Sequence, residues 1–227
     1  MDHFSTINSI GHYCGHFNDG FWGEPQNSLS NLTFIIGAAY AWSIWRKQEE
    51  RDIWQFVIIA FAASIGVGSF IFHSMPTRTT LVIDLIPIQI FSISYFGYVG
   101  INHLCLSKRT MVISAILFVA VRSGWITITP HGAFGGGITH IPALALLLTM
   151  AFFLHREKDL LAKYMLVASI TYLLALVARC FDLPLCSAFP IGFHWLWHIL
   201  TGLTSSILIY GIVKIPAKCK LKEAPNV

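Results

Sequence analysis

The sequence predicts an all-α, polytopic membrane protein built as a bundle of seven transmembrane helices. Of its 227 residues, 55% are hydrophobic and only 11% are charged, whereas soluble domains carry about 25% charged residues. The apolar residues gather into seven long runs without the polar stripe that a helix at the surface of a soluble domain shows. A helix of about 20 residues spans a bilayer, and each run approaches that length.

The seven runs are joined by short polar connections. A polar leader of residues 1–27, without the regions of a cleavable signal peptide, precedes a helical domain of residues 28–213, and a basic tail of residues 214–227 follows. The fourth and fifth runs are separated by the soft glycine-rich junction GAFGGG, residues 132–137. The predicted helices are Ser28–Trp45, Ile53–His73, Leu81–His103, Met111–Thr129, Ile138–Leu154, Leu161–Phe181 and Phe193–Val213.

The charges of the connections predict an orientation. Lysine and arginine gather in residues 46–51, 108–109 and 156–163 and in the tail. By the positive-inside rule, these segments face the cytosol and the N-terminus lies outside. Seven crossings place the termini on opposite sides, so the count and the charges agree. Because the basic residues are scattered among short loops, we expect membrane lipids and no nucleic acid as partners.

Three histidines are candidate metal ligands. His194 and His198 lie four residues apart at the start of the last predicted helix, on one face and one turn apart. Imidazoles with this spacing can chelate one metal ion, although two interfacial histidines that fill hydrogen bonds would show the same pattern. His73 ends the second predicted helix on the same outer side. Three histidines with an open position are the composition of a catalytic zinc site.

Two further residues add catalytic chemistry to the histidines. Asp84 is an ionisable group inside an apolar run, a functional hypothesis by default, with a carboxylate stabilised by the helix dipole as the alternative. Ser69 precedes His73 by one helical turn. A carboxylate can take a proton from water activated by a metal, and a hydroxyl can stabilise an oxyanion. These residues predict a metal-dependent hydrolase site just beneath the non-cytosolic surface.

An ordered set of motifs extends along nearly the whole chain. The motifs are YC at Tyr13–Cys14, FWGEPQNSLSN at Phe21–Asn31, GSFIFH at Gly68–His73, Asp84, RCFDLPLC at Arg179–Cys186 and HWLWHILTGL at His194–Leu203. In this set the chain resembles the alkaline ceramidase family of integral-membrane zinc amidases. FWGEPQN resembles the bacterial branch, which implies a bacterial inner membrane, and the loop charges place the active site toward its non-cytosolic face.

The resemblance implies a role for each site residue. His73, His194 and His198 would hold zinc, Asp84 would activate water, and Ser69 would steady the oxyanion. The implied reaction is hydrolysis of ceramide, or of another N-acyl lipid, to a free fatty acid and a sphingoid base or other amine.

The leader departs from the calcium-binding members of the family, which carry an acidic cluster beside YC. Here only Glu24 clearly matches, helped by Asn18 or Asp19 in the alternative that retains calcium. Calcium prefers six to eight oxygen ligands and imidazole is a poor one, so zinc is the expected cofactor and a retained calcium site is the less favoured alternative. His12 and His16 are expected to interact with Glu24 instead.

Two pairs of residues have expected structural roles. Cys14 and Cys186 are expected outside, and in some relatives the matching cysteines pair, so the resemblance favours a disulfide over two free thiols. Arg179 and Asp182, at i and i+3, are expected to form a salt bridge, with support of the site as the alternative.

Three other residues are expected to play no part in the chemistry. Cys105 and Cys219 are expected in the cytosol and reduced. Arg122 is expected to snorkel or to contact another helix, with a substrate-hydroxyl contact as the alternative.

A different class of function stays open. The related progestin and adiponectin receptor family also carries three histidines and uses zinc structurally in a seven-helix, non-enzymatic receptor. That family has its N-terminus in the cytosol, whereas the loop charges here point the other way. A transporter is the weaker alternative, because no paired broken helices are evident.

Overall fold

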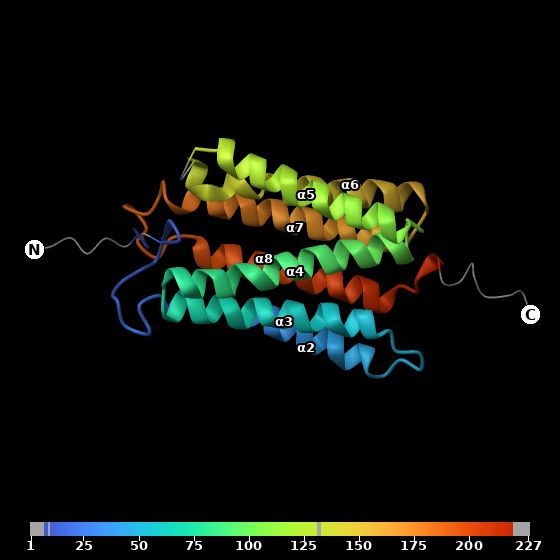
Figure 1. Cartoon of the computed structure of the whole chain (residues 1–227). Helices are drawn as coiled ribbons and strands as arrows, with labels where there is room; N and C mark the ends of the chain where they lie inside the picture. Colours follow the sequence, from blue (N-terminus) through green and yellow to red (C-terminus); the bar gives the residue numbers. More distant parts are fainter. Residues whose placement is uncertain (1–6, 9, 131–132, 220–227) are drawn as a thin grey trace, which may run out of the picture.

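Seven long helices, α2 to α8, run alongside one another in the computed structural model, which describes residues 7–8, 10–130 and 133–219 (Figure 1). Residues Ile7–Asn8 (β1) and Tyr13–Cys14 (β2) form a short antiparallel pair, with Ile7 opposite Cys14. The helices are α1 (Pro25–Ser30), α2 (Leu32–Trp45), α3 (Ile53–Ser74), α4 (Arg78–Asn102), α5 (Lys108–Ile128), η1 (Ala133–His140), α6 (Ile141–Arg156), α7 (Leu161–Asp182) and α8 (His194–Lys214).

Six helices of the described chain are long and apolar enough to cross a membrane. They are α3, α4, α5, the segment Phe134–Arg156 that contains α6, α7 and α8. Their outward faces carry large exposed apolar residues, such as Val112, Ile116 and Ile128 on α5. Such a surface is stable against lipid and unstable against water, so the chain is an integral membrane protein.

The first predicted helix is divided at Asn31. The side-chain amide of Asn31 donates to the carbonyl oxygen of Asn27 at 2.8 Å, and its backbone N–H donates to Ser28, three residues back. This tighter turn separates α1 from α2 and leaves α2 with 14 residues, below the ~20 that a straight span needs.

Local polar residues set the starts of the next three helices. The side chain of Asp52 accepts from the backbone N–H of Trp54, and that of Ser107 accepts from Thr110. Thr77 and Thr80 form a reciprocal capping box, so α4 begins at Arg78, three residues before its predicted start. These side chains satisfy backbone N–H groups that a helix end leaves free.

The glycine-rich junction before α6 is a distinct element. Phe134, Gly135 and Gly136 have left-handed backbone conformations within η1. Such φ values are easily adopted by glycine and interrupt a regular helix. The sequence therefore indicated the right place for a soft connection, between α5 and α6.

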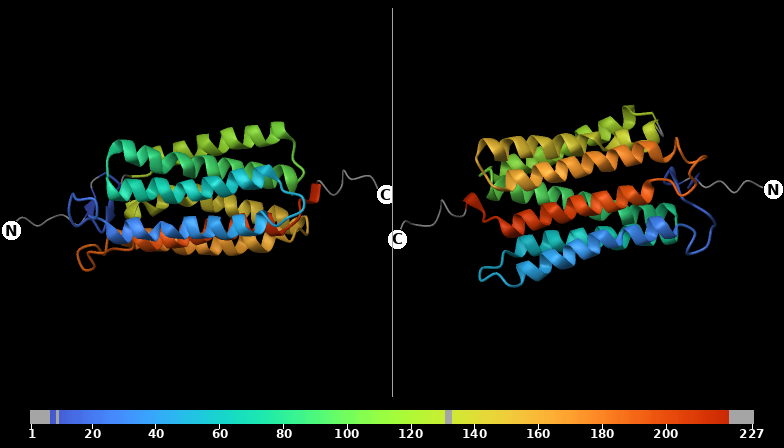
Figure 2. Two further views of the ribbon diagram at one scale, coloured as in Figure 1. Left: turned by 90° about the horizontal axis from the view of Figure 1, so that it is seen from below. Right: turned by 180° about the vertical axis from the view of Figure 1, so that it is seen from behind.

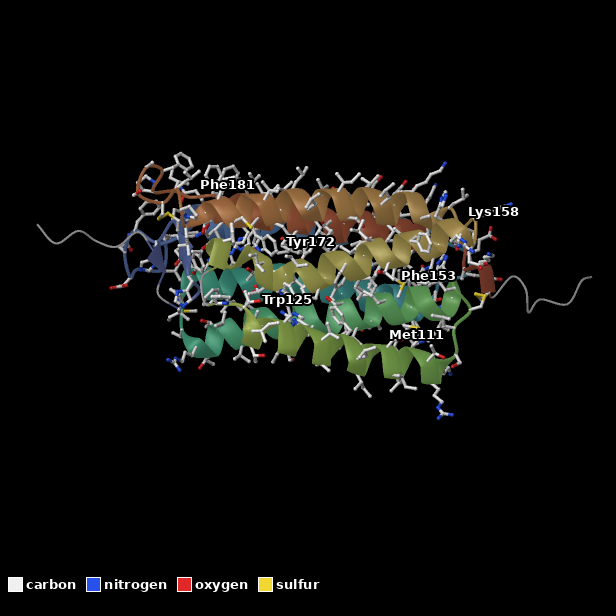
Figure 3. All side chains as sticks on the ribbon, turned by 90° about the horizontal axis from the view of Figure 1, so that it is seen from above. Met111, Trp125, Phe153, Lys158, Tyr172 and Phe181 are labelled. Carbon is white, nitrogen blue, oxygen red and sulfur yellow. A yellow bond between two sulfur atoms is a disulfide. The ribbon has the colours of Figure 1, made fainter. Side chains whose placement is uncertain are left out.

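The two ends of the bundle differ in charge. The turns after α2, α4 and α6 lie at the end where α8 terminates (Figure 1), and most of the 15 lysine and arginine residues lie in these turns or within three residues of them. The β1–β2 pair and the α7–α8 connection lie at the opposite end, as both further views also show (Figure 2). In the side-chain view, Lys158 marks the basic end and Phe181 the end with the hairpin (Figure 3).

The core is apolar and continuous along the bundle axis. Ile58, Tyr95, Leu154, Met165 and Ile209 are among its fully buried side chains, each at most 1% exposed. Near the basic end, Gln55 forms a buried polar link between helices: its amide donates to the Tyr98 hydroxyl at 3.0 Å and to the Ile212 carbonyl at 2.8 Å. Tight apolar packing of this kind holds the helices at fixed spacings.

The basic end contains a second cross-link that corrects a sequence-based expectation. Cys105, after α4, is bonded to Cys219, after α8, with the Cα atoms 5.5 Å apart. The expectation that both thiols are reduced was wrong. It rested on their expected location in the cytosol, and the sequence did not show that the two cysteines lie close enough to bond. The chain after α8 folds toward the α4–α5 turn, a contact between segments 114 positions apart.

Candidate functional site

Three buried histidines from two helices meet near the hairpin end. His73 lies at the end of α3, and His194 and His198 lie in the first turns of α8. One ring nitrogen from each lies within 4.8 Å of the others, and all three side chains are buried. This separation is compatible with three nitrogens around one ion, each about 2.0–2.1 Å from it.

The rings of His73 and His198 are held through their Nδ1 atoms. Nδ1 of His73 lies 2.6 Å from Oε2 of Glu24, and Nδ1 of His198 lies 3.0 Å from the carbonyl oxygen of Asn27 and 3.0 Å from the hydroxyl of Ser30. A carboxylate or carbonyl that accepts from one ring nitrogen leaves the other with its lone pair available to a metal. Nε2 of both rings is therefore the candidate ligand atom.

Glu24 joins several parts of the leader to this centre. Its carboxylate is fully buried and contacts His16 Nδ1 at 2.9 Å and the Tyr13 hydroxyl at 3.1 Å, besides His73. The expected contact of His16 with Glu24 is confirmed; for His12, the backbone carbonyl accepts from Arg179. The sequence singled out Glu24 for calcium and did not foresee its contact with His73, which joins positions 49 residues apart.

Tyr13 forms one wall of the histidine cluster. Its ring stacks on that of His194, with centroids 4.1 Å apart and planes 7° apart. Burial and the neighbouring Glu24 carboxylate raise the pKa of Tyr13 well above its usual value, so its phenol stays protonated and donates to Glu24. This residue was noted in the sequence only as half of a motif, and its contact with the ring was not predicted.

Asp182 organises the start of α8. Its carboxylate accepts from the backbone N–H groups of Phe193 at 2.7 Å, His194 at 3.0 Å and Cys14 at 2.9 Å. It is also paired with Arg179 at 3.2 Å, which is the expected salt bridge. A carboxylate at a helix N-terminus satisfies free N–H groups and the helix dipole, so this pair fixes the direction in which the HxxxH helix begins.

A disulfide joins the leader to the α7–α8 connection beside Asp182. Cys14 is bonded to Cys186, with Cα atoms 5.7 Å apart, as the resemblance implied. Gly192 adopts φ +65°, and a Cβ atom there would lie 2.4 Å from an Asp182 oxygen and 2.5 Å from the Cys14 Cβ. Only glycine therefore permits the α7–α8 connection to pass between these two residues.

Asp84 and Ser69 face the histidines from neighbouring helices. Asp84 lies in the second turn of α4, and both His73 and Ser69 are close enough to interact with its carboxyl group. Its Oδ1 atom is buried without a hydrogen-bond partner in the described structure. The α3–α4 approach depends on Gly68, because a Cβ atom there would lie 2.7 Å from the carbonyl oxygen of Ile83.

All five predicted catalytic and metal-ligating positions line one cavity of about 260 Å³. The cavity continues from the histidines into the bundle, where Phe34, Ile65, Leu147 and Leu208 line it. The Tyr172 ring also reaches this interior from α7, beside α6 (Figure 3). A polar centre at one end of an apolar cavity suits a molecule with a polar reacting group and a long hydrocarbon chain.

The residues present fit a metal ion. Besides the three converging imidazoles, Nδ1 of His194 is buried and has no hydrogen-bond partner within the described structure. Three neutral nitrogen donors suit zinc and several other transition metals, and they do not suit calcium. The cluster can therefore hold a metal ion, and Glu24 lies behind it as the partner of one ligand.

Comparison with known proteins agrees with the motifs. The family described as Ceramidase matches residues 20–225. The threonine/serine transporter TdcC of Edwardsiella tarda is 26% identical over 205 residues, which cover 77% of this chain and 44% of the transporter. The chain spans less than half the length of that relative, and this identity is too low to assign a family. The match over residues 20–225, together with the buried histidine cluster, identifies the chain as a member of the ceramidase family.

Proposed function

We propose that the protein is a zinc-dependent intramembrane amidase that hydrolyses ceramide, or a related N-acyl lipid, to a free fatty acid and an amine. Membership of the ceramidase family supports hydrolysis of a lipid amide. The observation that carries the proposal is the convergence of His73, His194, His198, Asp84 and Ser69 on one cavity. The 26% identity to a transporter is too low to support the transporter alternative, and the family match does not favour the receptor-type alternative.

His73, His194 and His198 are proposed to hold Zn²⁺. The bound ion would act as a Lewis acid that polarises a carbonyl group and lowers the pKa of water. Glu24 is assigned to the positioning of His73 and not to calcium, because it shares its oxygens with His73, His16 and Tyr13. Such outer carboxylates orient a ligating ring and raise its basicity.

Asp84 is proposed to move the proton in both halves of the reaction. Its carboxylate accepts a proton from the attacking water while the water oxygen forms a bond to the amide carbon. The Ser69 hydroxyl donates a hydrogen bond to the carbonyl oxygen as negative charge develops there. Asp84 then delivers the proton to the amide nitrogen as the C–N bond breaks, which releases a fatty acid and an amine.

The membrane arrangement is proposed from the charges. Residues 28–213 would form the membrane domain with seven crossings, the broken α1–α2 segment counting as the first. The leader 1–27 would lie outside and the tail 214–227 in the cytosol, with residues 220–227 outside the described structure. The basic end of the bundle would face the cytosol, so the site would lie near the non-cytosolic face of a bacterial inner membrane.

The proposal is tested by metal content and fatty-acid release. Protein purified in detergent is expected to contain about one zinc per chain and to release fatty acid from a panel of N-acyl lipids. His194→Ala is expected to lose both zinc and turnover, whereas Asp84→Asn keeps zinc and loses turnover. His155→Ala is the matched control, because His155 lies in the last turn of α6, at the end of the bundle away from the three histidines. Undiminished fatty-acid release by His194→Ala would overturn the mechanism.

A further inference from the structure

Arg122 is a cation inside a membrane-spanning helix that faces the reaction cavity. It lies on α5, where Phe118, one turn earlier, lines the same cavity. The residue beside it, Val121, is 53% exposed on the outer surface, whereas Arg122 is half-buried. The helix therefore turns Arg122, together with Phe118, toward the cavity and leaves Val121 on the outer surface.

Arg122 has no acidic partner among the residues that the structure describes. The structure shows no hydrogen bond or ion pair for it among the described residues, and the charged or polar groups that it influences are Tyr172 and His140. Arg179 provides the contrast, because it pairs with Asp182 and donates to the carbonyls of Gly11 and His12. A charge held within a span is costly, so an unpaired one indicates a function.

Arg122 lies in the half of α5 that is nearer the reaction centre. It is six residues from the end of α5, and Asp84 is six residues from the start of α4. Both helix ends lie toward the hairpin end of the bundle (Figure 1). At 1.5 Å per residue, each position lies about 9 Å from its own helix end. Because both side chains line the same cavity, a substrate with its amide at Asp84 can place a polar group at Arg122.

The cavity around Arg122 is polar on that side. His140 contacts the ring of Trp197 at 4.8 Å between centroids, and Tyr172 contacts the same ring at 5.8 Å. Both line the cavity with Arg122. A guanidinium with nearby hydroxyl and imidazole groups recognises oxyanions, because its planar N–H groups match two oxygens of a carboxylate or a phosphate.

We propose that Arg122 binds an anionic group on the amine portion of the substrate. Resting on the function proposed above, this assigns the preferred substrates to N-acyl lipids that carry a carboxylate or a phosphate beside the amide, over neutral ones. The apolar cavity takes the acyl chain, and Arg122 neutralises the charge of the polar end. Arg122 is then a residue that determines specificity without taking part in proton transfer.

Matched lipid pairs test the proposal. N-oleoylglycine and N-oleoylethanolamine share an acyl chain and differ by a carboxylate, and ceramide 1-phosphate and ceramide differ by a phosphate. We expect the wild type to hydrolyse at least one anionic member with a kcat/KM about tenfold above its neutral partner. Arg122→Gln should bring that ratio close to one by raising KM with little change in kcat, and Arg122→Lys should retain part of the preference. Which pair responds identifies the anion.

The control removes the same charge elsewhere on the helix. Arg109→Gln lies at the exposed basic end of α5, away from the cavity, and should keep the preference. Equal kcat/KM values within both pairs in the wild type, or an equal loss for both members in Arg122→Gln, would overturn the proposal.

A binding measurement separates this proposal from the enzymatic one. The Tm of the purified protein should rise more with N-oleoylglycine or ceramide 1-phosphate than with the neutral partner, and Arg122→Gln should abolish that difference. Any metal is common to all variants and cancels in the comparison. Absence of hydrolysis with this Tm difference intact would refute the amidase and support the Arg122 site. Absence of the difference in both pairs would refute the site.

Discussion

Nδ1 of His73 lies 2.6 Å from a carboxylate oxygen of Glu24, in a buried contact between the leader and the end of α3. The leader is thereby part of the candidate metal centre and not a simple extension. The same carboxylate contacts Tyr13, whose ring stacks on His194, so one buried acid influences two of the three candidate ligands. Several expected outcomes depend on this arrangement and on the helix packing around it.

Glu24→Gln keeps the size of the side chain and removes its charge. We expect metal affinity to fall about 10–100-fold, the usual effect of losing an outer carboxylate behind a ligating histidine. Metal retained after dialysis against graded chelator concentrations measures this. Glu49→Gln, at an exposed position in the α2–α3 connection, is the control. Unchanged retention by Glu24→Gln would show that Glu24 does not support the metal.

Ser69→Ala tests the proposed oxyanion donor. Removal of one such donor lowers kcat by about 100–1,000-fold in enzymes that rely on it, with KM less affected. Ser64→Ala on the same helix removes a hydroxyl that donates to the Phe61 carbonyl at 2.8 Å, and it should leave kcat unchanged. Steady-state kinetics of fatty-acid release compare the two. Equal effects of both substitutions would point to packing of α3 instead of catalysis.

Gly68→Ala tests the close approach of α3 and α4. The added Cβ atom would lie 2.7 Å from the Ile83 carbonyl oxygen, so the helices must separate near Asp84. We expect a loss of about 1–3 kcal/mol of stability, typical of overpacking, together with reduced turnover. Gly97→Ala, also helical, meets no atom within 4 Å and should be neutral or stabilising. Thermal unfolding in detergent decides, and equal Tm values for the two variants would contradict the packing argument.

The cysteine pairing predicts a thiol count. The chain has five cysteines, of which Cys14–Cys186 and Cys105–Cys219 are bonded and Cys180 is free. Maleimide labelling of the denatured, unreduced protein should therefore modify one cysteine, and labelling after reduction should modify five. Mass spectrometry of the intact chain counts the labels. Three labels before reduction, on Cys105, Cys180 and Cys219, would show the pair at the basic end to be reduced.

Asp159 contributes a pH-dependent element of stability at the basic end. Burial alone would raise its pKa, but hydrogen bonds from His103 and the Leu161 backbone, with nearby positive charge, lower the pKa below the usual value. A carboxyl group with a depressed folded-state pKa stabilises fully above its unfolded pKa of about 3.9 and loses this contribution as the pH falls through the folded value.

Asp159→Asn should therefore destabilise near pH 6 and matter less in acid. We expect a Tm about 2–4 °C lower at pH 6, which corresponds to about 1 kcal/mol in a chain of this size. The difference from wild type should shrink below about pH 4. Glu157→Gln removes a carboxylate from an exposed ion pair with Lys218 and should change the Tm little. A Tm difference between Asp159→Asn and the wild type that stays constant down to pH 3 would contradict the proposed contribution of the Asp159 carboxylate.

Local spacing made much of the site predictable. His194 and His198 share a helix face wherever that segment is helical, because a turn takes 3.6 residues. The same holds for Ser69 and His73 on α3, and for the salt bridge of Arg179 and Asp182. In each case the relative position depends on backbone geometry over three or four residues, which the sequence alone specifies.

Contacts between segments that are distant in the sequence were harder to predict. The first expected helix is divided at Asn31, whose side-chain amide bonds back to Asn27, and the sequence did not predict this division. The expectation for Cys105 and Cys219 was wrong because a compartment argument cannot measure the distance between two chain segments. That Arg122 has no ion-pair partner in the described part of the chain also required the structure, since any of the acidic residues there could have faced it.

By itself, the sequence determined the class of the protein, its long apolar helices and the residue types of a metal-dependent hydrolase, because composition and helical period are local properties. Only the tertiary structure decided that Glu24 lies behind His73, that Tyr13 covers His194, and that Asp182 sets the start of α8. These contacts join residues 49, 181 (194−13) and 12 positions apart, respectively. They arise from the packing of side chains between helices, and packing is a property of the whole fold.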